Sequence, residues 1–202
     1  MDIALQTLLE PPRAAPRRIR RRAPAEADTL PVITTRGRRL NVRPVTSEDT
    51  PLLADLLARL SARSCELRFL RPLASAEAIR REAERATQRG PQLGLALVAT
   101  DIERGVERAV ALVELAHDPS ALMVAELAAV VRDDYQGERL GTMMMRMLIE
   151  MATLRGVRAV RATLRADNRA SRRMLQGAGL VYRATTLSSE MTIFADLTTP
   201  TV

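Results

Sequence analysis

The chain has 202 residues, enough for one core of ordinary size and a terminal segment. Hydrophobic residues make up 47% of it but aromatic residues only 2%, so the core must be aliphatic and stacking platforms for single-stranded nucleic acid are not expected. All 31 basic residues are arginine, the net charge is +7, and one cysteine and one histidine exclude an intramolecular disulfide and a zinc site built from several such ligands.

Charge divides the chain into two predicted parts. Residues 1–45 hold ten of the arginines against four acids, whereas the remainder is close to neutral. The stretch "PPRAAPRRIRRRAP" is too poor in apolar residues to offset the entropy of ordering it. We therefore predict a basic, disordered tail over residues 1–34 and a folded domain over residues 35–202. With no apolar run of transmembrane length and no secretory-type leader, we expect a cytoplasmic protein.

The pattern of apolar residues predicts the elements in chain order. Alternating or continuous apolar runs predict strands, and apolar residues at helical spacing predict helices. The predicted strands are 38–45, 93–100, 108–115, 121–131, 157–164, 180–186 and 190–197; the predicted helices begin near Ser47 and Ser75 or span 140–155 and 168–178. This order predicts an α/β fold with a mixed sheet and helices on its faces.

A glycine-containing loop lies between strand 121–131 and helix 140–155, in "VVRDDYQGERLGT". A strand that runs through such a loop into a helix leaves free backbone N–H groups at the helix start, where they can receive an anion. Gly141 lies in the first helical turn, where glycine is less stable than alanine. Its presence indicates either close packing or close approach of a ligand.

Two motifs together resemble the GNAT superfamily of acyl-CoA-dependent N-acyltransferases. The family's pyrophosphate loop, Gln/Arg-x-x-Gly-x-Gly/Ala, matches Gln136 and Gly141 at its two ends, and its later Asn, Ala/Ser and Gly-apolar positions match Asn168, Ser171 and Gly179-Leu180. The stretch "NVRPVTSEDTPLLADLLARLSARSCELRFLRPL" is similar to GNAT domains of bacterial protein lysine acetyltransferases. The resemblance implies a mostly antiparallel sheet of about six to seven strands flanked by about four helices.

The resemblance also implies acetyl-CoA as cosubstrate, no metal, and a set of site residues. Glu126, ten residues before Gln136 on an otherwise apolar strand, is the candidate catalytic base, and Glu114 is the reserve. The implied cofactor-binding residues are Val130, Val131 and Arg132 through their backbone, Gln136, Gly137, Glu138, Arg139, Leu140, Gly141 and Thr142 around the pyrophosphate, and Asn168 and Ser171 near the pantetheine or nucleotide.

Two departures from the family pattern leave two functions open. Arg139 stands where the loop normally has its middle glycine, and Leu175 stands where many members have a tyrosine acting as general acid. The first hypothesis is an N-acetyltransferase that acts by direct transfer to a primary amine, either a protein lysine or a small molecule. The alternative is a catalytically weak or inactive sensor or protein-interaction module with a basic docking arm. Neither membrane nor nucleic acid is expected as a partner, and a homodimer is left open.

Overall fold

The computed structural model describes residues 29–88, 94–118 and 121–198. Within these ranges the chain forms five α-helices and eight strands. The strands are β1 (Leu30–Ile33), β2 (Arg39–Pro44), β3 (Gly94–Glu103), β4 (Val106–Asp118), β5 (Ala121–Val131), β6 (Ala159–Arg165), β7 (Arg183–Leu187) and β8 (Glu190–Asp196). The helices are α1 (Thr50–Ala58), α2 (Ala62–Phe69), α3 (Ala76–Thr87), α4 (Leu140–Leu154) and α5 (Arg169–Gly177).

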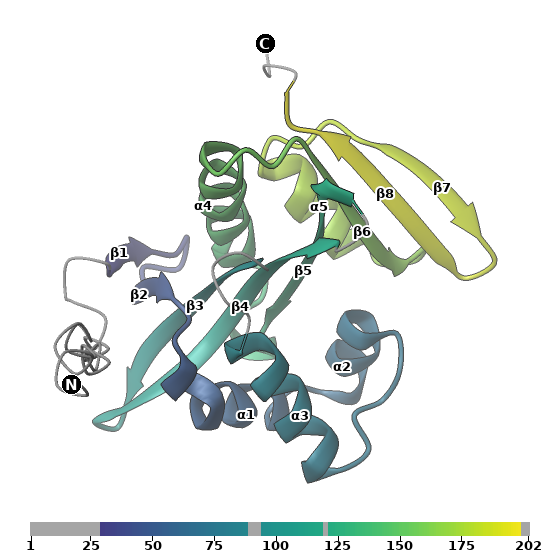
Figure 1. Cartoon of the computed structure of the whole chain (residues 1–202). Helices are drawn as coiled ribbons and strands as arrows, with labels where there is room; N and C mark the ends of the chain where they lie inside the picture. Colours follow the sequence, from purple (N-terminus) through teal and green to yellow (C-terminus); the bar gives the residue numbers. More distant parts are fainter. Residues whose placement is uncertain (1–28, 89–93, 119–120, 199–202) are drawn as a thin grey trace, which may run out of the picture.

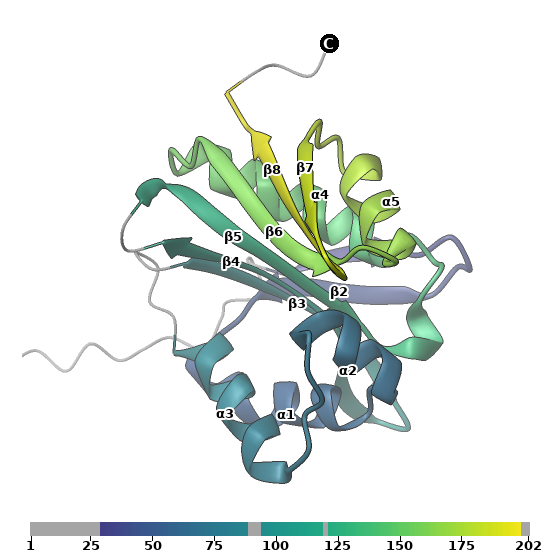
Figure 2. The same cartoon turned by 90° about the vertical axis from the view of Figure 1, so that its right-hand side faces the viewer.

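The strands form a single sheet in the order β1-β2-β3-β4-β5-β6-β8-β7. Every neighbouring pair is antiparallel except β5 and β6, which are parallel. Helices α1, α2 and α3 lie on one face of the sheet, and α4 and α5 lie on the other (Figures 1 and 2). None of the helices in the described ranges is both long enough and apolar enough to cross a membrane.

The central strands are apolar on both faces because helices cover both. Leu112 and Val130 pack with α1 and α3, whereas Val113 and Leu127 pack with α4. Successive strand residues point to opposite faces, so a strand between two helical layers reads as a nearly continuous apolar run. This explains why β3, β4 and β5 were recognisable from the sequence.

The structure exceeds the predicted six to seven strands and four helices by β1 and α2. The four residues of β1, Leu30–Ile33, begin six positions after the arginine-rich stretch ends and pair with β2, so Val32 is buried in the core. Helix α2 buries little besides Ser64 and Cys65. It is fixed by polar contacts instead: Ser61 caps it by accepting a hydrogen bond from the backbone N–H of Ser64. Neither element has the apolar periodicity by which the other elements are predicted.

A half-buried ion pair fixes the connection between β2 and α1. The Asp49 carboxylate accepts two hydrogen bonds of 2.8 Å from Arg43 and one of 2.7 Å from the backbone N–H of Thr46. Removal of one partner of a buried pair leaves the other charge uncompensated. We expect Asp49→Ala to lower the free energy of unfolding by about 3 kcal/mol in urea titrations. The control Asp55→Ala, which breaks more exposed pairs with Arg59 and Arg108, should cost less than about 1 kcal/mol.

The same pair predicts a loss of stability in acid. Burial alone would raise the pKa of Asp49, but the hydrogen bonds from Arg43 and Thr46 outweigh it and hold that pKa below its ordinary value. Because the folded-state pKa is the lower one, the stabilisation is present above the unfolded-state value of about 4 and is lost as pH falls through the folded-state value. Urea titrations should show a smaller pH dependence below about pH 4 in Asp49→Ala than in the wild type.

Candidate functional site

The only parallel strand pair in the described sheet separates along its length. Strands β5 and β6 pair only from Val124 to Glu126, and residues 127–131 have no partner on the β6 side. A cavity of about 260 Å³ lies at this divergence. Its apolar lining includes Leu67, Phe69, Leu127, Leu164, Met174 and Leu175. The separation therefore opens the centre of the sheet to a ligand that passes between two strands.

The backbone of β5 turns polar groups toward this divergence. The N–H of Arg132 donates to the carbonyl of Val110 on β4, so the pair Val110–Arg132 is hydrogen-bonded. In an antiparallel ladder such pairs alternate with pairs whose peptide groups point away from each other. Val131 and Ala129 therefore turn their N–H and C=O groups away from β4. Of the three predicted backbone ligands, Val130 and Arg132 face β4 and Val131 faces the divergence; Ala129 is a further candidate.

The loop from Gln136 to Thr142 has the backbone of an anion-binding turn. Gly137 and Arg139 have φ angles of 74° and 61°, both in the left-handed region. Arg139 is the N-cap of α4, and no side chain caps that helix. The N–H groups of Leu140, Gly141 and Thr142 have no acceptor within the helix, because the first intrahelical bond runs from Met143 to Arg139. Such a nest of N–H groups is a site for a negative charge.

Arg139 places a cation at this helix N-terminus. Its side chain is exposed, and its guanidinium has no hydrogen-bond or ion-pair partner in the described part of the chain. A positive charge is unfavourable beside the positive end of a helix dipole unless an anion lies between them. The left-handed backbone at this position also explains why glycine suits it in related loops. The arrangement is that of a site completed by an anionic ligand.

Gly141 is closely packed between α4 and its neighbours. A Cβ atom at this position would lie 3.0 Å from Met174 Sδ of α5 and 3.2 Å from Val131 Cγ2 of β5. A second contact joins the same helices, where a Cβ on Gly177 would lie 3.1 Å from Thr142 Cγ2. Of the two sequence-based interpretations of Gly141, close packing is therefore the one that the contacts support.

Glu138 differs from the rest of the loop because its side chain is fully buried. It points away from the N–H nest and toward the turn between β1 and β2, where Thr34 donates a hydrogen bond of 2.7 Å to it. Only the backbone of Glu138 is placed to take part in an anion site. Its position in the sequence gave no signal that the carboxylate would be turned inward.

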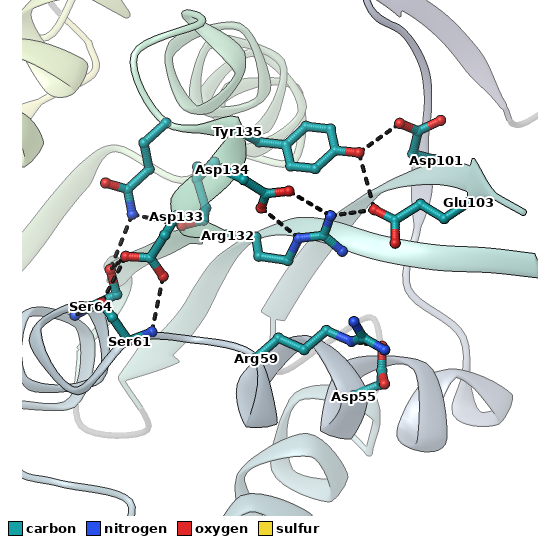
Figure 3. A network of polar contacts seen from close by, with 12 residues as sticks. Asp55, Arg59, Ser61, Ser64, Asp101, Glu103, Arg132, Asp133, Asp134 and Tyr135 are labelled. Atoms are coloured by element: carbon teal, nitrogen blue, oxygen red, sulfur yellow. Dashed lines mark hydrogen bonds and ion pairs between the residues drawn. The ribbon is translucent and has the colours of Figure 1, made fainter.

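The segment before the loop is tied to the start of α2. The Gln136 amide donates to the Ser64 hydroxyl at 3.1 Å and to the Val131 carbonyl at 2.9 Å. Asp133 accepts hydrogen bonds from the hydroxyls of Ser61 (2.7 Å) and Ser64 (2.8 Å), as Figure 3 shows. Burial acts to raise the pKa of Asp133, but these serine hydrogen bonds hold it below its ordinary value. Ser61, Ser64 and Asp133 were not predicted as site residues.

Arg132 and Tyr135 form a second network on the other side of this segment (Figure 3). The buried Arg132 guanidinium contacts Asp134 and Glu103, and the Tyr135 hydroxyl donates to Asp101 at 2.7 Å. Burial and the neighbouring Asp101 raise the pKa of Tyr135. These contacts fix Arg132 and Tyr135, which lead into the loop Gln136–Thr142, to strand β3.

Asn168 and Ser171 lie at the start of α5. The Asn168 side chain is buried and caps the helix by accepting a hydrogen bond of 3.0 Å from the backbone N–H of Ser171. Ser171 lines the cavity, together with Met174 and Leu175 of the same helix. Asn168 thus positions the helix, and Ser171 is the polar residue of the two that reaches the cavity. Leu175 brings no proton donor to the cavity wall.

The two candidate bases have different surroundings. Glu126 lines the cavity at the point where β5 and β6 separate, its side chain is 49% exposed, and its nearest cation is Arg161 at 3.8 Å. Glu114 is 2% exposed and forms an ion pair with Arg68. Because Glu114 pairs in register with Ala128, both carboxylates lie on the sheet face that carries α1 to α3. The geometry favours Glu126, which combines access to the cavity with the looser ion pair.

Arginines surround the cavity on the side of α2 and α3. Arg68, Arg71 and Arg85 all line it, and Glu82 pairs with both Arg71 and Arg85 at 2.8 Å. Cys65 lies nearby on α2 but is buried, and burial together with Asp133 raises the pKa of its thiol. That shift disfavours the thiolate, so Cys65 is not suited to act as a nucleophile.

Known proteins share this fold. A family model described as "Acetyltransferase (GNAT) domain" matches residues 39–181. No curated protein matched the chain. Among solved structures, the GNAT domain of PAT from S. lividans is similar with a TM-score of 0.72 and 22% identity, over 85% of this chain and 98% of that chain.

Two further structures share the fold. A cAMP-binding acyltransferase from Mycobacterium smegmatis has a TM-score of 0.56 and 25% identity, over 86% of this chain and 48% of that chain. This chain therefore spans about half the length of that protein. The ribosomal-protein-S5-alanine acetyltransferase from Vibrio fischeri has a TM-score of 0.61 and 16% identity, over 78% of this chain and 91% of that chain.

Proposed function

The chain belongs to the GNAT acetyltransferase family, and on that premise we propose that it transfers an acetyl group from acetyl-CoA to a primary amine, with a protein lysine as the acceptor. The observation that carries the proposal is the start of α4. There the helix has no side-chain cap, two loop residues have left-handed backbone, and Arg139 has no partner within the described residues. These features fit a pyrophosphate, which carries the negative charge that the site lacks.

The remainder of the site fits the other parts of the cosubstrate. Val131 and Ala129 offer backbone groups to the pantetheine amides where β5 and β6 separate, and the apolar cavity receives the thioester end. The residues present therefore fit the pyrophosphate, the pantetheine arm and the thioester end of acetyl-CoA. The acceptor enters from the side of α2 and α3, where Glu126 lies.

Glu126 acts as the general base in this proposal. It takes a proton from the amine, directly or through water, as the nitrogen attacks the thioester carbonyl carbon. The N–H groups of β5 that face the divergence stabilise the oxyanion that forms. The carbon–sulfur bond then breaks, the amide remains on the acceptor, and the thiolate leaves and takes a proton from water. Among the described residues that line the cavity there is no tyrosine, so the acid in this proposal is water.

Two peptides test the proposal and the choice of acceptor. One has an acetylated N-terminus and a single lysine, and the other has a free N-terminal alanine and no lysine, because the name of the V. fischeri enzyme specifies a protein alanine. Release of CoA thiol is followed with each. We expect turnover with the lysine peptide. Turnover with the alanine peptide alone would move the acceptor to an α-amine, and CoA binding without turnover on either peptide or on small amines would favour a non-catalytic module.

A further inference from the structure

The buried Glu138 carboxylate joins the proposed pyrophosphate loop to the N-terminal hairpin of β1 and β2. Thr34 donates a hydrogen bond of 2.7 Å to one carboxylate oxygen. The other oxygen makes no hydrogen bond but lies 3.3 Å from Arg38 Nε and 3.8 Å from a terminal nitrogen of Arg36. A buried carboxylate is stable only when it is paired in this way, so the contact fixes where the loop can lie.

The turn between β1 and β2 is closed by its own backbone hydrogen bonds and also bonds the loop through its backbone. Within it, the N–H of Thr34 donates to the carbonyl of Arg38 at 3.0 Å, and the N–H of Gly37 donates to the carbonyl of Thr34 at 2.9 Å. The N–H of Thr35 donates to the carbonyl of Glu138 at 3.2 Å. The loop is therefore held at Glu138 by a side-chain bond and a backbone bond from the same turn.

Arg38 extends this contact to the residues before the loop. Its guanidinium lies over the Tyr135 ring, 4.1 Å from the ring centre. Tyr135 is itself fixed by its hydrogen bond to Asp101. The hairpin thus holds both the loop and the short 3₁₀ turn Asp133–Tyr135 that leads into it.

We propose that Glu138 and Thr34 are positioning residues that set the affinity for acetyl-CoA, by holding the backbone N–H groups of the loop in the geometry that receives the pyrophosphate. Thr34, Arg36 and Arg38 all precede residue 39, where the match to the family model begins. The hairpin residues that contact Glu138 thus lie outside the matched residues, whereas Glu138 itself lies within them. The inference rests on the proposed function, because it assigns the loop to the cosubstrate.

Thr34→Val in the full chain tests this inference, because it removes the hydroxyl that bonds Glu138. The same hydroxyl accepts a hydrogen bond of 3.2 Å from the backbone N–H of Arg38, so the variant also loses one bond within the turn and keeps the turn's backbone bonds. Affinity for CoA is measured by isothermal titration, and kcat and KM for acetyl-CoA with the lysine peptide. We expect CoA to bind about tenfold more weakly and KM for acetyl-CoA to rise by the same factor, with kcat unchanged. Thr34→Ser keeps the hydroxyl and should restore the affinity.

Thr87→Val is the matched control, since Thr87 is also a buried threonine with a bonded hydroxyl but packs between α1 and α3. It should lose comparable stability and bind CoA as the wild type does.

Arg38→Gln, which weakens the ion pair with Glu138, should also weaken CoA binding, and it replaces Thr34→Val in the test if that variant does not fold. Unchanged CoA affinity in a folded Thr34→Val or Arg38→Gln protein, or an equal loss in Thr87→Val, overturns the inference alone. A wild type that binds no CoA overturns the proposed function as well.

Discussion

Replacing Glu126 by Gln should lower kcat for acetyl transfer by about 10²- to 10⁴-fold while leaving the affinity for acetyl-CoA unchanged. The amide keeps the size of the side chain but cannot accept the proton of the attacking amine. Because Glu126 is about half exposed and its contact with Arg161 is loose, the substitution should not lower the unfolding temperature. Steady-state kinetics, CoA titration and thermal unfolding of the same preparation check the three parts.

Glu114→Gln separates the two candidate bases. Glu114 is buried with Arg68, so its neutralisation should lower the free energy of unfolding by about 3 kcal/mol. Glu190→Gln, on an exposed strand residue away from the cavity, should change neither stability nor turnover. Wild-type kcat in Glu126→Gln would remove Glu126 from the mechanism, and a large loss of kcat in a stable Glu114→Gln protein would transfer the role to Glu114.

Replacing Arg139 should weaken CoA binding by about 10- to 100-fold, because a charge-assisted hydrogen bond to phosphate contributes about 1.5 to 3 kcal/mol. Two variants separate the contribution of the guanidinium from that of the left-handed backbone. Arg139→Ala and Arg139→Gly both lose the guanidinium, but only glycine adopts the left-handed backbone without strain. We therefore expect the glycine variant to be more stable than the alanine variant by about 1 kcal/mol and to bind CoA at least as well. Isothermal titration and urea unfolding measure the two quantities.

Arg155→Ala is the control for the charge itself, since Arg155 is an exposed arginine at the opposite end of α4. It should leave CoA affinity unchanged at physiological salt, because charges that far apart are screened. If Arg139→Gly binds CoA more tightly than the wild type, the guanidinium hinders phosphate binding instead of donating hydrogen bonds to it. Arg139 would then be a substitution that lowers the affinity of the loop relative to the family's glycine.

The sequence predicted those parts of the fold that rest on apolar periodicity. Strands β3 to β6 and helices α4 and α5 each bury one or two apolar faces, so their residues carry the spacing that defines them. Helix α2 could not be found in this way, because it is fixed by Ser61, Ser64 and Asp133, which are 72 positions apart at most and have no local pattern. The formation of β1 likewise depends on its pairing with β2, and nothing in the sequence of β1 predicts that pairing.

The candidate site was predictable to the level of the loop but not of its side chains. The glycine spacing around Gly137 and Gly141 indicates where the chain turns, and the structure adds which backbone groups face the divergence between β5 and β6. Alternation along β5 directs Val131 to the divergence and Arg132 to β4, a distinction that depends on register with Val110. The inward turn of Glu138 depends on Thr34, more than 100 positions away, and follows from no local rule.

These contacts place the loop between two supports. On one side Gln136 and Asp133 bond α2, and on the other Glu138 and Tyr135 contact the β1–β2 hairpin. Preorganised N–H groups bind an anion without the cost of ordering the loop at the moment of binding. Under the proposed function, these supports explain how a loop without its middle glycine holds the N–H groups that would receive a pyrophosphate.

Isothermal titration of the full-length protein with CoA and with pantetheine tests the central claim most directly. We predict one CoA bound per chain at micromolar concentration, and pantetheine bound at least about tenfold more weakly because the loop contacts would be lost. Absence of CoA binding at high micromolar concentration, or equal affinity for pantetheine, would contradict the assignment of residues 136–142 to the pyrophosphate.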